Sequence, residues 1–292
     1  MQDIPSRTAE FMALFRALET ARPAFRHLFK DRLARRFLSP SLRKVASFSR
    51  LPGFHNIFVG IIDGRWPGAR TSGVSRTREI DDLTVEALSG GTKQVVLLGA
   101  GFDSRPYRLS GMERATVYEV DHPATSGRKQ EIIKRALKSV PSNVRFVSMD
   151  FNRDSLDEKL SGAGFKSSLP TFIIWEGVSN YLSPEAVDTT LAWCGRAAVA
   201  GRVAFTYIDK KVLDEPGSFY GTDRITNLLK GVGERWTFGL NPGELRSYLE
   251  KRGLRLETDS NAAQYREKHF GKRSARMKGY EFYRLAVASF GK

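Results

Sequence analysis

The sequence of 292 residues predicts an α/β fold built on a mostly parallel sheet. From residue 94 onward, short apolar runs alternate with segments of helical periodicity, a pattern typical of βαβ units whose sheet is covered on both faces. The first four apolar runs end in acidic residues or in a glycine pair, as expected where parallel strands end together at one edge. The first 50 residues instead show helical periodicity.

The N-terminal region is expected to form a helical cap. Apolar residues recur at helical spacing in two series, Phe11, Leu14, Phe15 and Leu18, and then Phe25, Leu28, Phe29, Leu33 and Phe37. Residues 51–73 are rich in glycine and proline and predict loop and turn, whereas residues 75–88 predict a helix. We therefore expect two units, a helical cap and loop over residues 1–75 and a sheet-containing domain over residues 76–292.

Strands and helices are expected to alternate through the second unit. The predicted strands are residues 94–99, 115–121, 143–150, 171–177, 202–209 and 279–290, and the predicted helices are residues 124–140, 183–199 and 241–254. Ser183 and Asn241 stand where a side chain caps the first turn of a helix. Residues 208–240 show no clear period and contain many glycines, so we expect a lid there.

The charge of the chain limits its partners. Lys and Arg outnumber Asp and Glu by 47 to 32, and the net charge of +15 attracts anions such as nucleic acid, acidic lipid or acidic substrates. The basic residues lack the interleaved aromatic residues of a surface that binds single strands. We therefore expect no nucleic-acid partner, and we interpret the charge as solvated helix faces that attract an acidic small molecule. We expect no membrane partner either, because no apolar run is long enough to span a bilayer.

Cysteine and histidine usage argues against disulfides and metal sites. The single cysteine, Cys194, lies in an apolar helical pattern and is expected in the core. The four histidines are scattered without metal-ligand spacing, and we expect no metal. No apolar run approaches the ~20 residues that span a bilayer, and the N-terminal segment lacks the layout of a secretory signal, so a cytoplasmic location is expected.

The predicted strand ends carry the residues that indicate chemistry. These ends are Gly99-Ala100-Gly101-Phe102-Asp103, Glu119-Val120-Asp121, Asp150-Phe151 and Glu176-Gly177. In a doubly wound sheet the ligand binds beyond the carboxyl ends of the strands, at the switch in strand order. Acids gathered at one edge repel one another, so we expect a ligand that offers them hydroxyl groups, amines or a cation.

The glycine loop differs from the fingerprint of a dinucleotide site. That fingerprint is G-x-G-x-x-G with an acid about 20 residues further on, which binds the ribose. Asp121 fits the ribose acid, but Ser104 replaces the third glycine, and Asp103 would face a pyrophosphate with like charge. A glycine loop with a ribose acid and no tolerance for phosphate suits an adenosine ligand with an amino-acid tail, such as S-adenosylmethionine. A dinucleotide-dependent oxidoreductase is the alternative.

Several sequence blocks resemble the leucine carboxyl methyltransferase family: VVLLGAGFDSRPYRL, VYEVDHP, MDFN, EGVSNYL and the upstream block SRTREIDD. The segment TAEFMALFRALETARPAFRHLFKDRLARRF resembles the N-terminal helices of the bacterial branch, whose O-methyltransferases act on carboxyl or hydroxyl groups of polyketides and related compounds. The resemblance implies the class I methyltransferase, Rossmann-like fold, with a seven-stranded sheet whose last strand is antiparallel and a helical cap over the substrate. It also implies S-adenosylmethionine as the cofactor.

The resemblance assigns a first group of residues to the methionine end of the cofactor. Arg76 corresponds to the arginine that holds the cofactor carboxylate, a task suited to a bidentate guanidinium. Gly99, Ala100 and Gly101 correspond to the loop against which the methionine tail packs, and Asp103 corresponds to the acid of that loop.

A second group is assigned to the nucleoside and to the acceptor. Asp121 corresponds to the acid that takes the ribose hydroxyls, and Asp150 and Phe151 correspond to residues near adenine. Glu176 corresponds to the acid near the cofactor ammonium and methyl group, and Tyr181 to a tyrosine beside the acceptor. Glu176 and Tyr181 are therefore the predicted catalytic residues.

Purely structural roles for some of these residues stay open. Arg76 and Arg78 could pair with Asp81 and Asp82 along one helix face. Asp121 could cap the helix that follows it.

Other charged residues near the strand ends are ambiguous in the same way. Glu119 points to the same face as Asp121 by strand alternation, but it could equally pair with a nearby arginine. We interpret Arg105 and Arg108 as salt-bridge partners and His122 as a residue placed by the turn rather than as a base.

The predicted function is S-adenosylmethionine-dependent O-methyl transfer that forms a methyl ester on a small-molecule carboxylate. A carboxylic acid is ionised at neutral pH and needs no general base, and the basic composition attracts an anionic acceptor. Methylation of a phenol or alcohol is one alternative, with His122 or a lid residue as the base. A non-catalytic protein that binds the cofactor is another. We expect a monomer or a homodimer.

Overall fold

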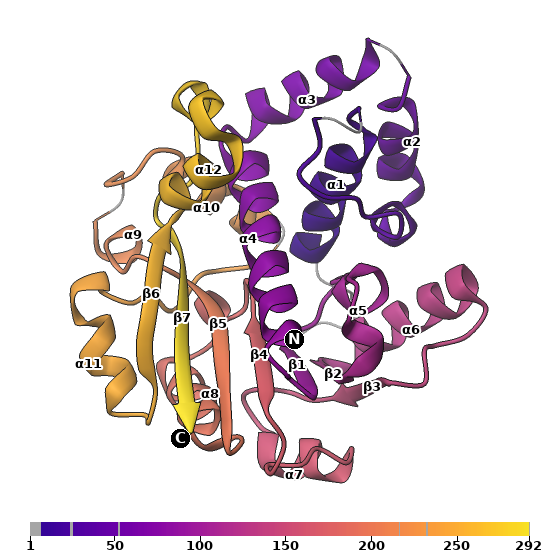
Figure 1. Ribbon diagram of the computed structural model, residues 1–292. Helices are drawn as coiled ribbons and strands as arrows, with labels where there is room; N and C mark the ends of the chain where they lie inside the picture. Colours follow the sequence, from indigo (N-terminus) through magenta and orange to yellow (C-terminus); the bar gives the residue numbers. More distant parts are fainter. Residues whose placement is uncertain (1–6, 24–25, 52, 216, 232, 292) are drawn as a thin grey trace.

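The centre of the protein is a seven-stranded sheet (Figure 1). The computed structural model describes residues 7–23, 26–51, 53–215, 217–231 and 233–291. The strands are β1 (Gln94–Leu98), β2 (Thr116–Asp121), β3 (Val144–Ser148), β4 (Thr171–Trp175), β5 (Ala200–Ile208), β6 (Arg255–Asn261) and β7 (Tyr283–Gly291). Their order is β3-β2-β1-β4-β5-β7-β6, and β7 runs antiparallel to both of its neighbours. The predicted fold, including the antiparallel last strand, is confirmed.

Helices surround this sheet and form the cap. The described α-helices are α1 (Arg7–Ala21), α2 (Pro40–Phe48), α3 (Phe54–Arg65), α4 (Ala69–Ser89), α5 (Arg105–Arg108), α6 (Pro123–Leu137), α7 (Leu156–Gly162), α8 (Pro184–Arg196), α9 (Lys211–Asp214), α10 (Thr222–Gly231), α11 (Leu245–Glu250) and α12 (Ala262–Phe270). Short 3-10 helices are η1 (Ala34–Phe37), η2 (Met112–Arg114), η3 (Ser179–Tyr181), η4 (Pro242–Glu244) and η5 (Gly271–Arg276). Within the described residues, no helix has the length and hydropathy that crossing a bilayer requires.

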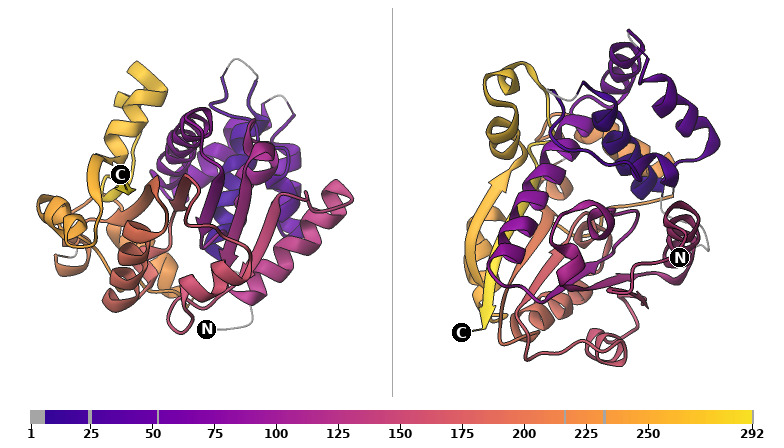
Figure 2. Two further views of the ribbon diagram at one scale, coloured as in Figure 1. Left: turned by 60° about the horizontal axis from the view of Figure 1, so that its bottom comes forward. Right: turned by 45° about the vertical axis from the view of Figure 1, so that its right-hand side comes forward.

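Alternating side chains of the strands bury both faces of the sheet. On β1, Val96 and Leu98 pack in a core with α7, α8 and α11, which also holds Cys194 as predicted. Val95 and Leu97 pack on the other face with α4 and α12. A third core joins α1, α2 and α3 to α6, and the cap helices lie above the sheet in the right-hand view of Figure 2.

The switch in strand order lies at β1, which pairs with β2 on one side and with β4 on the other. The connections that leave these two strands diverge, and they open a crevice at the carboxyl ends of the strands. The chain covers this crevice with α1 and with the segment that contains α10. The fold therefore positions a ligand site between the sheet edge and the cap.

The prediction of loop and turn for residues 51–73 is wrong. This segment contains α3 and the first turn of α4. The glycines that suggested a loop include Gly53 and Gly68, which have positive φ angles of 83° and 94° and stand directly before the two helices. The apolar residues of α3 recur at helical spacing between them.

Three further segments differ from the predictions. The second apolar series predicts a helix, but from Leu28 onward only η1 forms, because the Asp31 carboxylate accepts hydrogen bonds from the amides of Leu33 and Ala34 and turns the chain locally. Phe25 of that series lies outside the described residues.

The segment 208–240 holds α9 and α10 in place of an aperiodic loop. Strand β6 was not predicted, since its residues are mostly polar and lie on an edge of the sheet, where none of them is fully buried.

Candidate functional site

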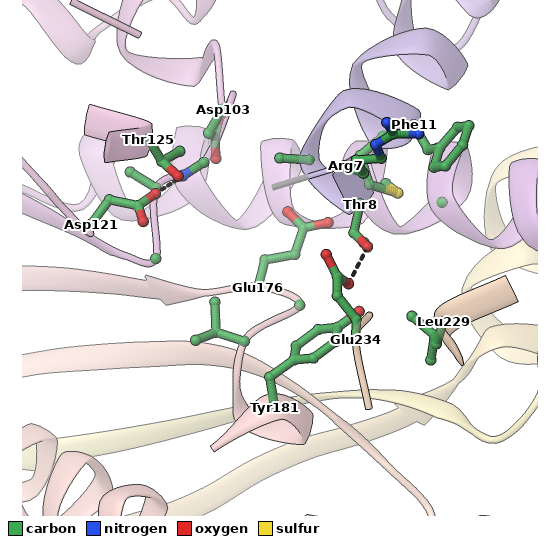
Figure 3. A pocket seen from close by; sticks show the side chains of 18 of the residues that line it. Arg7, Thr8, Phe11, Asp103, Asp121, Thr125, Glu176, Tyr181, Leu229 and Glu234 are labelled. Carbon is green, nitrogen blue, oxygen red and sulfur yellow. Dashed lines mark hydrogen bonds between the residues drawn. The ribbon is translucent and has the colours of Figure 1, made fainter. Parts of the chain in front are cut away.

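A cavity of about 810 Å³ opens at the carboxyl ends of the parallel strands, beneath the cap (Figure 3). It falls in the size range of ligand pockets. All of the predicted site residues line it: Arg76, Gly99, Ala100, Gly101, Asp103, Asp121, Asp150, Phe151, Glu176 and Tyr181. The structure therefore brings these residues together, and the role of each stays a prediction.

The glycine loop after β1 uses its backbone amides within the protein. The amides of Gly99 and Ala100 both donate to the carbonyl of Val120, at 2.8 and 3.0 Å, and the amide of Gly101 donates to the Asp121 carboxylate. Gly99 has a φ of 68°, and a Cβ there would lie 2.3 Å from Val178 Cγ2, so no larger residue fits. A pyrophosphate would need these amides as donors. Their internal use argues against the dinucleotide alternative.

Asp121 ends β2 with its carboxylate at the cavity. One oxygen accepts from Gly101 N, and the other accepts from His122 N at 2.7 Å. Burial raises the pKa of Asp121, and the two amide hydrogen bonds oppose this rise. Asp121 is not the N-cap of α6, because His122 occupies that position and offers no side-chain cap. A carboxylate has about four acceptor positions, which leaves acceptor capacity for hydroxyl groups.

The acids of the glycine loop and of β4 are compensated by arginines of the chain. Asp103 lies 2.5 Å from Nη1 of Arg105, and Glu176 lies 2.9 Å from the same atom and 2.8 Å from Nε of Arg76. Burial raises the pKa of Asp103, but the charges of Arg105 and Lys129 outweigh it and lower the pKa to about 2. Burial also raises the pKa of Glu176, but the charges of Arg105 and Arg76 outweigh this effect and lower the pKa below its usual value. The expectation that a ligand must neutralise these acids is therefore wrong for Asp103 and Glu176.

Arg76 and Arg78 of α4 differ in position: the first is a site residue and the second is a surface residue. Arg76 is buried, pairs with Glu176 and lies over the ring of Tyr283 at 5.1 Å, so its predicted alternative pairing with Asp81 or Asp82 is wrong. Arg78 does pair with Asp82, at 2.9 Å along the helix.

Asp81 on α4 pairs instead with the two arginines that follow the glycine loop. Arg105 Nε lies 2.8 Å from Asp81 Oδ1, and Arg108 Nη1 lies 2.6 Å from Asp81 Oδ2. These pairs confirm the salt-bridge interpretation of both arginines. They also hold α4, and with it Arg76, against the glycine loop.

Glu119 does not line the cavity. It is buried beneath the glycine loop and pairs with the equally buried Lys129 of α6, with 2.9 Å between Oε1 and Nζ. The predicted arginine partner is thus a lysine. Lys129 Nζ also lies 3.4 Å from the carbonyl oxygen of Ala100, so this pair supports the loop from below.

The residues after β3 form the part of the wall assigned to adenine. Asp150 Oδ1 accepts from the amide of Asn152 at 3.0 Å, which closes a tight turn. Met149, Phe151 and Asn152 line the cavity beside it. The turn therefore presents one apolar ring and several polar atoms to a ligand.

Sequence reasoning missed the cap wall of the cavity. From α1, the residues Thr8, Phe11, Met12 and Phe15 line the cavity, and their spacing is that of one helix face. This spacing is visible in the sequence and predicts the helix of the cap, but it does not show which side chains of that helix face a ligand. Thr8 donates a hydrogen bond of 2.6 Å to Glu234 of the segment after α10, where we expect a lid, and Figure 3 shows Glu176 between this pair and Asp121.

The remaining cap residues come from the C-terminal part of the chain. Trp236, Tyr280 and Tyr283 line the cavity, and the hydroxyl of Tyr280 is buried with no hydrogen-bond partner among the described residues. Tyr283 begins β7, opposite Ile208 at the end of β5. Because β7 is antiparallel, its first residue lies at the edge where the parallel strands end.

Tyr181 ends η3 and faces the cap. Burial raises its pKa, and the nearby Tyr283 and Glu234 raise it further. The Tyr181 hydroxyl is therefore protonated at neutral pH and can donate a hydrogen bond to a ligand, but it is not a base.

The chain matches the family model of leucine carboxyl methyltransferase over residues 9–195. A relative from Mycobacterium avium is 38% identical over 117 residues, which cover 40% of this chain and 37% of the relative. A relative from Mycobacterium bovis is 30% identical over 249 residues, which cover 80% of this chain and 70% of the relative. Both carry the provisional name of S-adenosyl-L-methionine-dependent methyltransferase, in agreement with the predicted cofactor.

The match to other curated relatives is also partial. The chain spans 50% of the length of a Streptomyces coelicolor relative with the same provisional name. A crystal structure of a provisionally named methyltransferase from Thermobifida fusca covers 99% of this chain and 96% of its own, with a TM-score of 0.58 and 16% identity. At that identity the likeness shows a shared fold.

Proposed function

Because the chain belongs to the leucine carboxyl methyltransferase family, we propose that it is an S-adenosylmethionine-dependent methyltransferase that forms a methyl ester on a small-molecule carboxylate. One observation carries this proposal. A single cavity has the glycine loop, Asp121, Glu176 and Arg76 on one wall and an aromatic cap on the other.

The donor set of the sheet wall fits S-adenosylmethionine. Asp121 has acceptor capacity left for the ribose hydroxyls, and Phe151 offers a ring to adenine. Arg76 uses Nε for Glu176, and its outer nitrogens have no carboxylate partner among the described residues, so they suit the carboxylate of the methionine tail. Glu176 and Asp103 are ionised and suit the ammonium group. When bound, this cofactor supplies an electrophilic methyl group, which passes to a carboxylate oxygen while its bond to sulfur breaks and sulfur keeps the electron pair.

The acceptor would lie against the cap. Arg7 lines the cavity and has no carboxylate within ion-pair distance in the described part of the chain, so it can attract an acceptor carboxylate. Tyr181 is protonated and can hold one oxygen of that carboxylate by donating a hydrogen bond. The cap excludes water and aligns the acceptor oxygen, which is the main contribution that a protein makes to a displacement of this kind.

A hydroxyl acceptor is the second candidate, and Glu234 favours it. This lid carboxylate faces the cavity close to Tyr181 and is held by Thr8 at 2.6 Å. A phenol has a pKa near 10 and would need a base to remove its proton. Glu234 is placed to do this, whereas it would repel an acceptor carboxylate.

One set of measurements separates the two candidates. With the acceptor identified by mass spectrometry, a methyl ester would be cleaved by dilute hydroxide, and its rate of formation would be nearly flat from about pH 6.5 to 8.5. Glu234→Gln would then leave the rate unchanged or raise it. A product that resists alkali, with a loss of about 100-fold or more in Glu234→Gln, would establish the hydroxyl acceptor instead.

Calorimetry tests the cofactor independently of the acceptor. S-adenosylhomocysteine is expected to bind, and NADH is not. Binding of NADH alone would overturn the methyltransferase proposal. Binding of S-adenosylhomocysteine without methyl transfer to any metabolite in an extract would favour the non-catalytic alternative.

A further inference from the structure

An apolar stripe runs along the outer side of α3. Its members are Phe54, Ile57 and Ile61, which are 46%, 56% and 62% exposed. Their spacing of three and four residues places them on one face of the helix. Phe48 and Leu51, just before α3, are also exposed, so five of the nine exposed large apolar side chains in the described residues lie within residues 48–61.

The helix is anchored through its other side, so the exposed stripe is a fixed feature of the surface. Ile62 is buried in the core of the cap. Asp63 pairs with Arg70 of α4 at 2.6 Å. Figure 1 shows α3 along the outer edge of the cap, away from the sheet. The water-exposed surface of a protein rarely has an apolar patch of this kind unless a partner covers it.

Basic residues are concentrated in the segment just before the stripe, which includes η1 and α2. Between residues 22 and 50 the sequence has nine Lys and Arg residues and one acid, Asp31, which is buried and paired with Arg16. No carboxylate of the described residues pairs with the following members of this group: Arg32, Arg35, Arg36, Arg43, Lys44 and Arg50. Arg35 donates a hydrogen bond of 3.0 Å to Ser47 of α2, and Arg43 of α2 donates to the carbonyl oxygens of Arg36 and Leu38, so the basic residues of η1 and α2 lie side by side.

We propose that this face of the cap, α3 with the basic residues of α2 and the segment before it, docks on a membrane surface that contains anionic lipid. The apolar stripe would enter the boundary between headgroups and acyl chains, and the arginines and lysines would bind the headgroups.

A membrane with anionic lipid matches both the apolar stripe and the basic residues of this face. A second copy of the chain would bring two like-charged surfaces together, and nucleic acid would leave the aliphatic side chains uncovered. The proposal replaces the expectation of no membrane partner, which considered only apolar runs long enough to span a bilayer, and it does not depend on methyl transfer.

Vesicle sedimentation tests this proposal with the full chain. Vesicles of phosphatidylcholine mixed with phosphatidylglycerol should bind the protein, and vesicles of phosphatidylcholine alone should bind it much less. The double variant Ile57→Asp, Ile61→Asp should weaken binding by about tenfold or more. Lys44→Gln with Arg50→Gln should weaken it by about thirtyfold, because each charge near an anionic surface contributes on the order of 1 kcal/mol.

Val199→Asp is the matched control, since Val199 is 54% exposed but lies directly before β5, outside the cap. Its binding should equal that of the unmodified protein. The proposal is overturned if the mixed vesicles do not bind the protein, or if the Ile57, Ile61 variant binds them as well as the unmodified protein does. It is also overturned if sedimentation velocity shows a dimer that this variant dissociates while vesicles bind neither form.

Discussion

The two walls of the cavity satisfy their buried polar groups in different ways. On the sheet wall, Arg105 donates hydrogen bonds to Asp81, Asp103 and Glu176, and the amides of the glycine loop are bonded to β2 or to its terminal acid. On the cap wall, the hydroxyl of Tyr280 is buried without a partner among the described residues. The polar groups of the sheet wall are thus held in place by the protein before a ligand binds, and Asp121 and Arg76 keep hydrogen-bonding capacity for one. The cap wall instead contains a buried hydroxyl that the described residues leave without a partner.

This difference assigns the two tasks of the site to different parts of the chain. A wall whose charges are already paired and hydrogen-bonded is preorganised and suits one ligand of defined shape. A buried donor without a partner costs free energy until a ligand satisfies it. We therefore expect the sheet wall to determine the cofactor and the cap wall to determine the acceptor.

The largest expected effect comes from breaking the charge pair beneath the glycine loop. Lys129→Met would leave Glu119 buried without its partner, and both side chains are only 1% exposed. Removing one member of a buried pair typically costs about 3–5 kcal/mol of stability. Urea unfolding at pH 8 would measure this loss.

The double variant Lys129→Met, Glu119→Gln is the control, because it removes both charges. It should recover most of the lost stability, since replacing a whole buried pair is often close to neutral. If the double variant is as unstable as the single one, packing rather than charge pairing holds the loop in place.

The next effect tests whether the sheet wall determines the cofactor. Asp121→Ala should weaken the binding of S-adenosylhomocysteine by about 1–3 kcal/mol, because buried hydroxyl groups lose a charged acceptor. Calorimetry on the folded variant measures this. His122→Ala serves as the neighbouring control and should have a smaller effect, since its amide still donates to Asp121. Unchanged affinity in Asp121→Ala would exclude Asp121 from the binding site.

A smaller effect appears in the pH dependence of stability. The pKa of Asp103 is lowered from 3.8 to about 2 in the folded protein, so the pair with Arg105 stabilises the fold above pH 4 and this stabilisation is lost as the pH falls toward 2. The shift corresponds to about 2 kcal/mol. In Asp103→Asn, urea unfolding at a series of acidic pH values should show a shallower loss of stability by that amount. Glu185→Gln, on the exposed start of α8, should keep the slope of the unmodified protein.

The sheet wall could be predicted from the sequence because its residues follow directly after strands. Glycines, acids and apolar runs are adjacent in the chain there, so a short segment contains both the strand and the site residue that the strand positions. Asp121 and Glu176 were found in this way, and the family resemblance added Arg76. The pairing of Asp103 with Arg105 could not be predicted, because the direction of a side chain after a tight turn depends on packing from α4.

The cap wall could not be predicted, because its residues come from three distant segments. Thr8 begins α1, Glu234 follows α10, and Tyr280 precedes β7. Helix α10 carries Ile225, Leu228 and Leu229 at helical spacing, but it has only 10 residues and lies between glycines, so it was not predicted. Tyr283 lies at the site only because β7 runs antiparallel, and a search limited to the carboxyl ends of strands overlooks it.

The smallest expected effect separates the acceptor from the cofactor. Tyr280→Phe removes a buried hydroxyl that has no partner in the described residues, so stability should stay the same or rise slightly. The affinity for S-adenosylhomocysteine should also stay the same, because Tyr280 lies on the cap wall. If this hydroxyl donates to the acceptor, the acceptor KM should rise by about 2–10-fold, which corresponds to one hydrogen bond. Tyr265→Phe is the matched control, since the Tyr265 hydroxyl is equally buried and unpartnered among the described residues but lies outside the cavity. Equal changes in KM for both variants, or weaker cofactor binding in Tyr280→Phe, would contradict the division of the cavity into a cofactor wall and an acceptor wall.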